Sequence, residues 1–97
     1  EHDSSDFKEE KLAENEYLFS GRLEIDYINE KFDLNIPESE DYETVAGFIL
    51  HHHEEIPNEN DKINIGIYEF EIIKMQNPKI ELIKLKIKIK YYTPYIN

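Results

Sequence analysis

The stretch DYETVAGFILHHHEEIP, Asp41 to Pro57, carries the clearest helical pattern in the sequence. Asp41 or Thr44 can act as N-cap, because the side chain of either accepts a hydrogen bond from a free N–H group of the first turn. Apolar and His side chains then recur at the i, i+3, i+4, i+7 spacing of one helical face. That face consists of Val45, Phe48, Ile49 and His52. Gly47 costs about 1 kcal/mol against Ala inside a helix, so we expect another backbone to approach it closely. Pro57 ends the pattern, and the stretch predicts a helix that packs one face on an apolar partner.

The C-terminal third supplies that partner as a set of strands. Apolar residues alternate with polar ones in three runs, and Asn77-Pro78 is typical of a turn between the last two. The alternating residues are Ile63 and Ile65, then Tyr68, Phe70 and Ile72, then Ile83, Leu85, Ile87 and Ile89. The adjacent apolar pairs Ile72-Ile73 and Leu82-Ile83 break the alternation and predict a bulge, or an edge of the pattern, near each. Glu69 and Glu71 are expected to face lysines across the sheet.

The N-terminal part is more polar. Residues 1–16 are acidic with few apolar anchors, which predicts a linker or loosely attached arm. Residues 17–19 and 23–25 predict two short strands or one interrupted strand, with a turn at Ser20-Gly21. Asp26 is a suitable N-cap for a first helix over Tyr27 to Phe32. We therefore expect an α+β domain over residues 17–92, in the order β-α-α-β-β-β, and a tail over 93–97. Its small antiparallel sheet of about four strands should carry two helices on one face.

Composition excludes several classes of function. The formal net charge is −11; residues 1–61 carry 19 Asp and Glu against 4 Lys and Arg, and residues 62–97 carry 3 against 7. Such an acidic chain lacks the basic footprint that phosphate binding needs, so we expect no nucleic-acid partner. It has no Cys, which excludes disulfides and thiolate metal sites. No apolar run approaches the ~20 residues of a membrane-spanning helix, so we expect no direct membrane insertion. Because the sequence begins at Glu1, we expect it to be part of a longer protein.

Candidate chemistry is sparse. His51, His52 and His53 suggest a metal site, but consecutive helical residues point about 100° apart and cannot converge on one ion. His51 and Glu55, four residues apart, are the candidate metal ligands, against the alternative of exposed positions with His52 partly buried. No nucleophile elbow, P-loop, dinucleotide fingerprint or zinc-protease motif occurs, so we expect no catalytic residues and no enzyme.

The order of residues nevertheless resembles that of a known family, the CorC/HlyC transporter-associated domain. The resemblance rests on Gly21-Arg22, Ile28-Asn29-Glu30, Ile36-Pro37, Asp41-Tyr42, the run Thr44 to Ile49, Ile56-Pro57 and the closing strands. Its structural motif positions fall on Gly21, Asp41, Thr44, Gly47 and Pro57. This chain departs from the family at Asn58 to Asp61, where members usually have a Gly after the Pro; Asn60 tolerates the left-handed geometry, so the turn should survive. The His run replaces a commonly apolar segment, so this helix should extend further than usual.

The resemblance implies a fold similar to the FAD-binding/transporter-associated domain fold. It also implies a non-catalytic accessory domain at the C-terminus of a CorC-like magnesium and cobalt transporter or hemolysin-like membrane protein, on the cytoplasmic face of the inner membrane. Its partners would be the CBS-domain pair and the transmembrane domain of the parent chain, or a second copy as a homodimer. The fold analogy alone points to FAD, no residue argues for it, and we expect no cofactor. Two alternatives stay open: a domain that senses a divalent cation or a small ligand, and an interaction module of an envelope or gliding-motility assembly.

Overall fold

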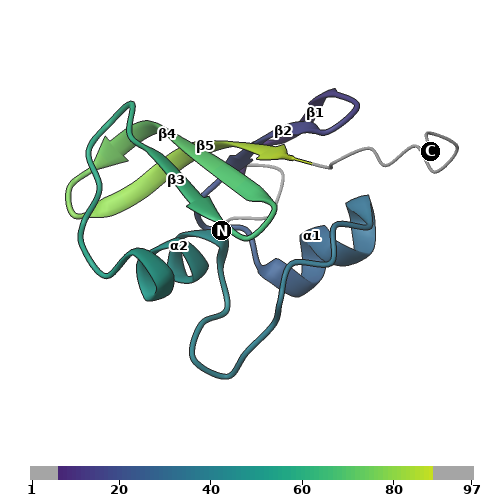
Figure 1. Ribbon diagram of the computed structural model, residues 1–97, viewed down its shortest axis with the longest axis horizontal. Coiled ribbons are helices and arrows are strands. Elements are labelled where there is room, and N and C mark those ends of the chain that lie inside the picture. The colour runs from purple at the N-terminus through teal and green to yellow at the C-terminus, as the bar shows by residue number, and fades with distance from the viewer. Residues whose placement is uncertain (1–6, 89–97) are drawn as a thin grey trace, which may run out of the picture.

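The computed structural model describes residues 7–88 as a five-stranded antiparallel sheet with two helices packed on one face (Figure 1). In chain order the elements are β1 (Glu9–Ala13), β2 (Glu16–Ser20), α1 (Ile25–Phe32), α2 (Val45–His53), β3 (Lys62–Ile65), β4 (Tyr68–Gln76) and β5 (Lys79–Ile87). The sheet order is β1-β2-β5-β4-β3, so the last strand lies at the centre. The predicted α+β class, with both helices on one face, is confirmed.

The strand β1 is the main difference from the prediction. The predicted arm over residues 1–16 is wrong for Glu9–Ala13, which pairs with β2 through Glu9 opposite Phe19 and Lys11 opposite Tyr17. β1 is an edge strand with mostly exposed side chains, so it needs no alternating apolar pattern. The observed order is therefore β-β-α-α-β-β-β. Residues 1–6 and 89–97, which include the predicted tail and the predicted domain boundary at residue 92, lie outside the described part of the chain.

The first helix begins two residues earlier than predicted. Residues 23–25 were predicted as a strand and Asp26 as the N-cap; instead α1 starts at Ile25, and its N-cap is Glu24, whose side chain makes no capping bond. The N–H of Ile25 donates to the backbone oxygen of Glu43 at 2.8 Å. This backbone partner supplies an acceptor at the helix start, and the sequence pattern of a side-chain cap is therefore misleading here.

The second helix confirms Thr44 as the N-cap, because its Oγ1 accepts a hydrogen bond from the N–H of Gly47 at 3.0 Å. The other candidate, Asp41, lies outside the helix and is exposed. The expected end of the helix at Pro57 is wrong: α2 ends at His53, and Glu54 adopts the left-handed conformation with φ 69°. Its N–H donates to the oxygen of Leu50, so a left-handed cap ends the helix before Pro57 is reached. That the helix extends further than is usual in the family stays a prediction.

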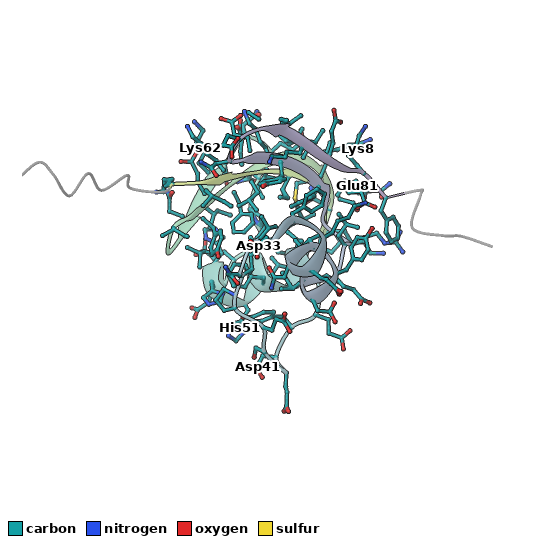
Figure 2. The ribbon with its side chains drawn as sticks, turned by 90° about the vertical axis from the view of Figure 1, so that its right-hand side faces the viewer. Lys8, Asp33, Asp41, His51, Lys62 and Glu81 are labelled. Carbon is teal, nitrogen blue, oxygen red and sulfur yellow. The ribbon has the colours of Figure 1, made fainter. Side chains whose placement is uncertain are left out.

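The core lies between the helices and the inner face of the sheet (Figure 2). The side chains that are entirely buried include Phe19 from β2, Ile28 from α1, Phe48 and Ile49 from α2, Phe70 and Ile72 from β4, and Ile83 and Leu85 from β5. The predicted strand residues of the C-terminal third thus form most of the surface on which α2 packs. The predicted bulge after Ile72 is confirmed, since Ile72 pairs with Ile83 and the register shifts before Lys74.

The outer face of the sheet carries charges in alternating rows. Glu69 lies opposite Lys86 and Glu71 opposite Lys84, as predicted, and Glu71 also lies opposite Lys62 of β3. Opposite charges on neighbouring strands each contribute about 0.2–1 kcal/mol. This face is therefore largely neutralised by its own cross-strand pairs, and most of the unbalanced negative charge of residues 7–88 lies on the helix side.

Candidate functional site

The chain segments that lead into the two helices are joined to each other. Residues 21–25 and 43–46 run side by side through three backbone hydrogen bonds. The N–H of Ile25 donates to the oxygen of Glu43, that of Val45 to Leu23 at 2.9 Å, and that of Ala46 to Gly21 at 2.9 Å. This pairing fixes both helix N-termini relative to β2, and surface hollows lie on either side of it.

Gly21 is at the centre of this pairing. Its N–H donates to the oxygen of Glu81 at 3.1 Å, and its own oxygen accepts from Ala46. A Cβ at this position would overlap the backbone oxygen of Ile80 and lie 3.3 Å from the Cβ of Ala46. The absence of a side chain therefore lets the β2–α1 turn lie directly against the start of β5. Sequence reasoning placed a turn here but did not foresee this contact.

The other motif positions are also structural. The close backbone approach expected at Gly47 is not found: a Cβ there would lie 3.2 Å from the Cβ of Tyr42, whereas the nearest backbone atom, the Cα of Tyr42, would be at 3.8 Å, an ordinary contact. The N–H of Asp41 donates to the Oγ of Ser39 at 3.0 Å, in the loop before α2. Pro57 is buried, directly after the exposed Ile56. The left-handed turn predicted at Asn60 is confirmed by its φ of 77°.

The candidate metal pair does not have the geometry on which it was predicted. His51 is in the last turn of α2, but Glu55 follows the left-handed Glu54, so the two residues are not spaced as one helical face. The ring of His51 instead packs 5.3 Å from that of Tyr42. His52 is exposed rather than partly buried, with its ring 4.6 Å from Phe48. Within residues 7–88, no three His, Asp or Glu side chains are arranged to hold a metal ion.

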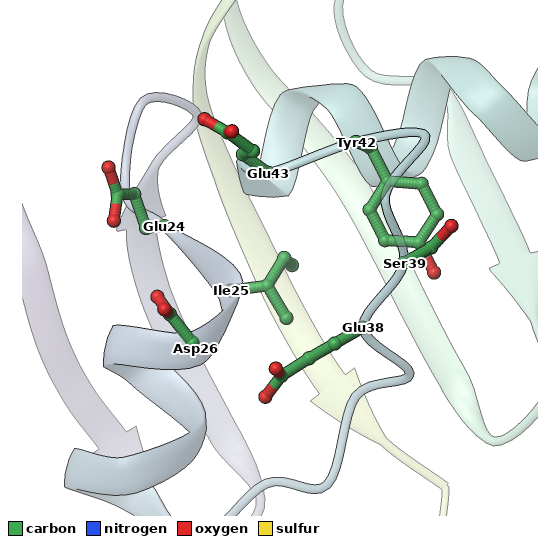
Figure 3. A pocket seen from close by; sticks show the side chains of 7 residues that line it. All are labelled: Glu24, Ile25, Asp26, Glu38, Ser39, Tyr42 and Glu43. Carbon is green, nitrogen blue, oxygen red and sulfur yellow. The ribbon is translucent and has the colours of Figure 1, made fainter.

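An acidic hollow of about 290 Å³ lies between the start of α1 and the loop before α2 (Figure 3). Four carboxylates line it, from Glu24 and Asp26 beside α1, and from Glu38 and Glu43 on the loop. Tyr42 closes one side, and its hydroxyl donates to the oxygen of Pro37 at 2.8 Å. Burial, and then the charge of Asp41, raise the pKa of Tyr42 above its usual value, so it stays a neutral donor. The hollow can attract cations, although its carboxylates do not form a ligand set.

A second hollow, on the other side of the paired segments, is apolar. This groove of about 720 Å³ is lined by Phe7, Ala46, Leu50, Ile56 and Ile80 together with the glycines and the β4–β5 turn. Arg22 and Lys79 are at its rim, and among the described residues that line it there is no Asp or Glu. The guanidinium of Arg22 lies 5.1 Å from the ring centroid of Phe7. We call this surface the Phe7 groove.

A polar cluster that the sequence did not predict fastens β1 to α1. Lys31 Nζ donates to Glu9 Oε1 at 2.8 Å, and the hydroxyl of Tyr27 donates to the same carboxylate at 2.9 Å. The hydrogen bond from Lys31 lowers the pKa of Glu9 below its usual value; burial opposes this, and the Tyr27 bond adds to it. These hydrogen bonds join Glu9 to Tyr27, 18 positions along the chain, and to Lys31, 22 positions along it. No local sequence pattern could have indicated them.

These features can be compared with known proteins. Residues 10–88 match the family described as the transporter associated domain, CorC_HlyC. The chain belongs to the CorC_HlyC family. The match covers every described element except the first residue of β1, so the resemblance inferred from the sequence is confirmed. This family is associated with transporters and is not a known catalytic family.

The relatives with curated names are larger proteins. The chain is 34% identical over 71 residues to a polyamine export protein of Haemophilus influenzae, and 34% identical over 68 residues to a UPF0053 inner membrane protein of Escherichia coli. These matches cover 72% and 70% of the chain but only 16% of each relative. The chain therefore corresponds to a small part of such proteins. Neither helix of the described region is long and apolar enough to cross a bilayer.

Solved structures share the fold of this CorC_HlyC domain. A hemolysin domain from Enterococcus faecalis has a TM-score of 0.71 at 26% identity, covering 84% of this chain and 98% of that one. The domain from a CBS domain protein of Porphyromonas gingivalis has a TM-score of 0.67 at 24% identity, covering 80% and 94%. A domain from a Xylella fastidiosa hemolysin, in complex with Mg²⁺ and Mn²⁺, has a TM-score of 0.65 at 19% identity, covering 81% and 95%. The last two are alike in fold alone.

Proposed function

We propose that this chain is a non-catalytic accessory domain of a CorC/HlyC-type membrane protein, and that it acts by docking on other parts of its parent chain. The observation that carries the proposal is the family match over residues 10–88, combined with relatives of which the domain is only 16%. Its position would be the cytoplasmic face of the inner membrane, where it would meet a CBS-domain pair.

The architecture of the domain supports a docking role. The paired segments 21–25 and 43–46 join the starts of both helices through three backbone hydrogen bonds, and they leave the Phe7 groove and the acidic hollow open on the surface. A rigid body with surface hollows of opposite charge is well suited to bind a neighbouring domain in one orientation.

The cargo of the parent protein is part of the same proposal. The family resemblance points to magnesium and cobalt, whereas the Haemophilus relative is named for polyamine export. Polyamines and divalent metal ions are both cations, so we propose a cation transporter as the parent. The test is transport of Mg²⁺, Co²⁺ and putrescine into vesicles by the parent protein with and without residues 7–88.

We expect deletion of the domain to change the rate or the apparent affinity for the transported cation by at least threefold. The Ile67→Asp variant, altered at an exposed residue away from both hollows, is the matched control and should transport normally. Transport that is identical with and without residues 7–88, for all three cations, would contradict an accessory role.

The acidic hollow favours a second candidate function, the sensing of a cation by the domain itself. Four carboxylates from two chain segments line it, and one solved structure of the Xylella hemolysin domain is a complex with Mg²⁺ and Mn²⁺. The test is an NMR titration of the chain with Mg²⁺, Co²⁺ and putrescine at constant ionic strength, which removes simple screening. Saturating shifts near Glu24 and Glu43 that disappear in the Glu43→Gln variant would support it. Uniform, non-saturating shifts would reject it, and Glu54→Gln serves as the charge-matched control.

A further inference from the structure

Three cationic side chains from separate segments line one hollow of about 430 Å³ beside the sheet. They come from Lys8 next to the start of β1, Arg22 in the β2–α1 turn and Lys74 in β4. Glu81 is the one carboxylate among the described residues that line this hollow, which we call the cationic hollow. In a chain of net charge −11, it therefore has a local excess of positive charge. A hollow lined by one sign of charge concentrates ligands of the opposite sign, so its ligand should be an anion.

The sheet register places two of these cations on either side of the hollow. The backbone oxygen of Lys8 accepts a hydrogen bond from the N–H of Ser20 at 2.8 Å. Ser20 lies opposite Leu82 of β5, and Leu82 lies opposite Lys74. The backbones of Lys8 and Lys74 are thus three strand spacings apart, or about 14 Å. At that separation, two long lysine side chains can approach one anion from opposite sides.

Arg22, the third cation, has two contacts that restrict where its guanidinium can lie. Its backbone N–H donates to the Oγ of the buried Ser20 at 3.1 Å, and its guanidinium lies 5.1 Å from the ring centroid of Phe7. A guanidinium presents paired N–H donors that match two oxygens of one phosphate group. Because Arg22 is already held, it loses less conformational freedom when it binds such a group.

The cations of this hollow are available to a ligand. The ion pairs within residues 7–88 are Lys8–Glu10, Lys31–Glu9 and Lys84–Glu16. Neither Arg22 nor Lys74 takes part in them. The contact of Lys8 with Glu10 is 3.6 Å long, and both side chains are more than half exposed. A surface pair of this kind contributes little to stability, so Lys8 can exchange it for a bound anion.

We propose that the cationic hollow binds a phosphate-bearing anion, with Arg22 as the bidentate donor and Lys8 and Lys74 as flanking charges. Three positive charges against one carboxylate favour a doubly charged phosphate over a monoanion such as chloride. The volume of about 430 Å³ lies in the range of small-molecule sites and leaves room for the organic part of a phosphate ester beside Phe7 and Leu82. The phosphate belongs either to a soluble ester or to a lipid headgroup. This site goes beyond the proposed docking role and does not depend on it.

The chain offers a matched pair of lysines to test the site. Lys74 and Lys86 are both exposed strand residues, but only Lys74 lines the hollow, whereas Lys86 lies opposite Glu69. Replacement of either by Gln removes one positive charge from the domain. A general effect of net charge would therefore appear in both variants, and loss of a specific contact in Lys74→Gln alone. Arg22→Lys keeps the charge and removes the planar donor fork.

The experiment is an NMR titration of the isotope-labelled 97-residue chain with pyrophosphate at constant ionic strength, which removes simple screening. We expect saturating shifts confined to the amides around Lys8, Arg22 and Lys74. The dissociation constant should rise at least tenfold in Lys74→Gln and at least threefold in Arg22→Lys, and it should not change in Lys86→Gln. Sedimentation with phosphatidylcholine vesicles, with and without phosphatidic acid, distinguishes the two sources of phosphate. Binding to the phosphatidic acid vesicles that Lys74→Gln abolishes and Lys86→Gln keeps would assign the site to a lipid headgroup, and pyrophosphate binding alone to a soluble ester.

Two results would overturn the inference. One is uniform, non-saturating shifts with pyrophosphate together with no sedimentation on either kind of vesicle. The other is equal weakening of binding by Lys74→Gln and Lys86→Gln, which would show attraction to net charge and no site. Both results would leave the proposed docking function standing, because that function is measured with the parent protein.

Discussion

Replacement of Gly21 by Ala tests how the two helices are attached to the sheet. The added Cβ overlaps the Ile80 backbone oxygen, so the β2–α1 turn and the start of β5 must separate. Overpacking of this kind costs about 1–3 kcal/mol. The separation also strains the hydrogen bonds that Gly21 makes with Glu81 and Ala46, each worth about 1 kcal/mol. We therefore expect Gly21→Ala to lower the free energy of unfolding by about 3 kcal/mol.

Urea unfolding followed by circular dichroism measures this loss. Small domains have m values of about 1–3 kcal/mol per molar urea, so the midpoint should fall by about 1–3 M. Gly66→Ala is the first control: a Cβ there meets nothing within 4 Å, but φ is +62°, which costs about 1–2 kcal/mol for a residue with a side chain. Gly47→Ala is the second control. There the gain in helix propensity of about 1 kcal/mol opposes the cost of placing a Cβ 3.2 Å from the Cβ of Tyr42. The reasoning is refuted if Gly21→Ala is no more destabilising than Gly66→Ala.

Three further changes have predictable results. Asn29→Ala removes the side-chain amide that hydrogen-bonds both the N–H and the oxygen of Ile36 at 2.8 Å. The free energy of unfolding in urea should therefore fall by about 2 kcal/mol, and an unchanged midpoint would contradict this role of Asn29. Thr44→Ala removes the N-cap of α2 and should lower the free energy of unfolding by about 1 kcal/mol in the same assay. Thr44→Ser keeps a capping hydroxyl and should keep most of that stability. Because Lys31 lowers the pKa of Glu9 in the folded state, the ionised Glu9 carboxylate stabilises the fold. This stabilisation is fully present above the unfolded pKa of Glu9 and is lost as the pH falls through the folded pKa. Lys31→Gln should therefore reduce the loss of stability between pH 5 and pH 3 and raise the Glu9 pKa measured by NMR; an acid unfolding profile identical to the wild type would rule the interaction out.

The sequence predicted the elements whose packing determines their pattern. The alternation from Ile63 to Ile87 indicated the three C-terminal strands, including the bulge after Ile72, because the inner face of that sheet is buried. The helix at Val45 was predicted for the same reason. β1 was not predicted, because backbone pairing and the Glu9–Lys31 contact hold it rather than an apolar face. Edge strands of this type leave no period-2 signal.

The candidate site was harder to predict, since its hollows form between segments distant in sequence. Nothing local relates Phe7 to Ile56 or Ile80, which the fold brings to one groove. The start of α1 was misplaced for a related reason: the partner of the Ile25 N–H is a backbone oxygen from residue 43, and backbone groups leave no signature in a sequence. Gly21 was recognisable only as a turn residue and through the family resemblance. A glycine at a family motif position indicates that another part of the chain approaches its backbone closely, and this is the sequence signal that points to Gly21.

The central claim is that the domain works by docking on its own parent chain. The most direct measurement is an NMR titration of the isotope-labelled 97-residue chain with a purified CBS-domain pair, the partner proposed above. Saturating shifts confined to one face of residues 7–88, with the outer face of the sheet serving as the internal reference, are the predicted result. A spectrum that does not change at millimolar concentrations of that pair would contradict the claim.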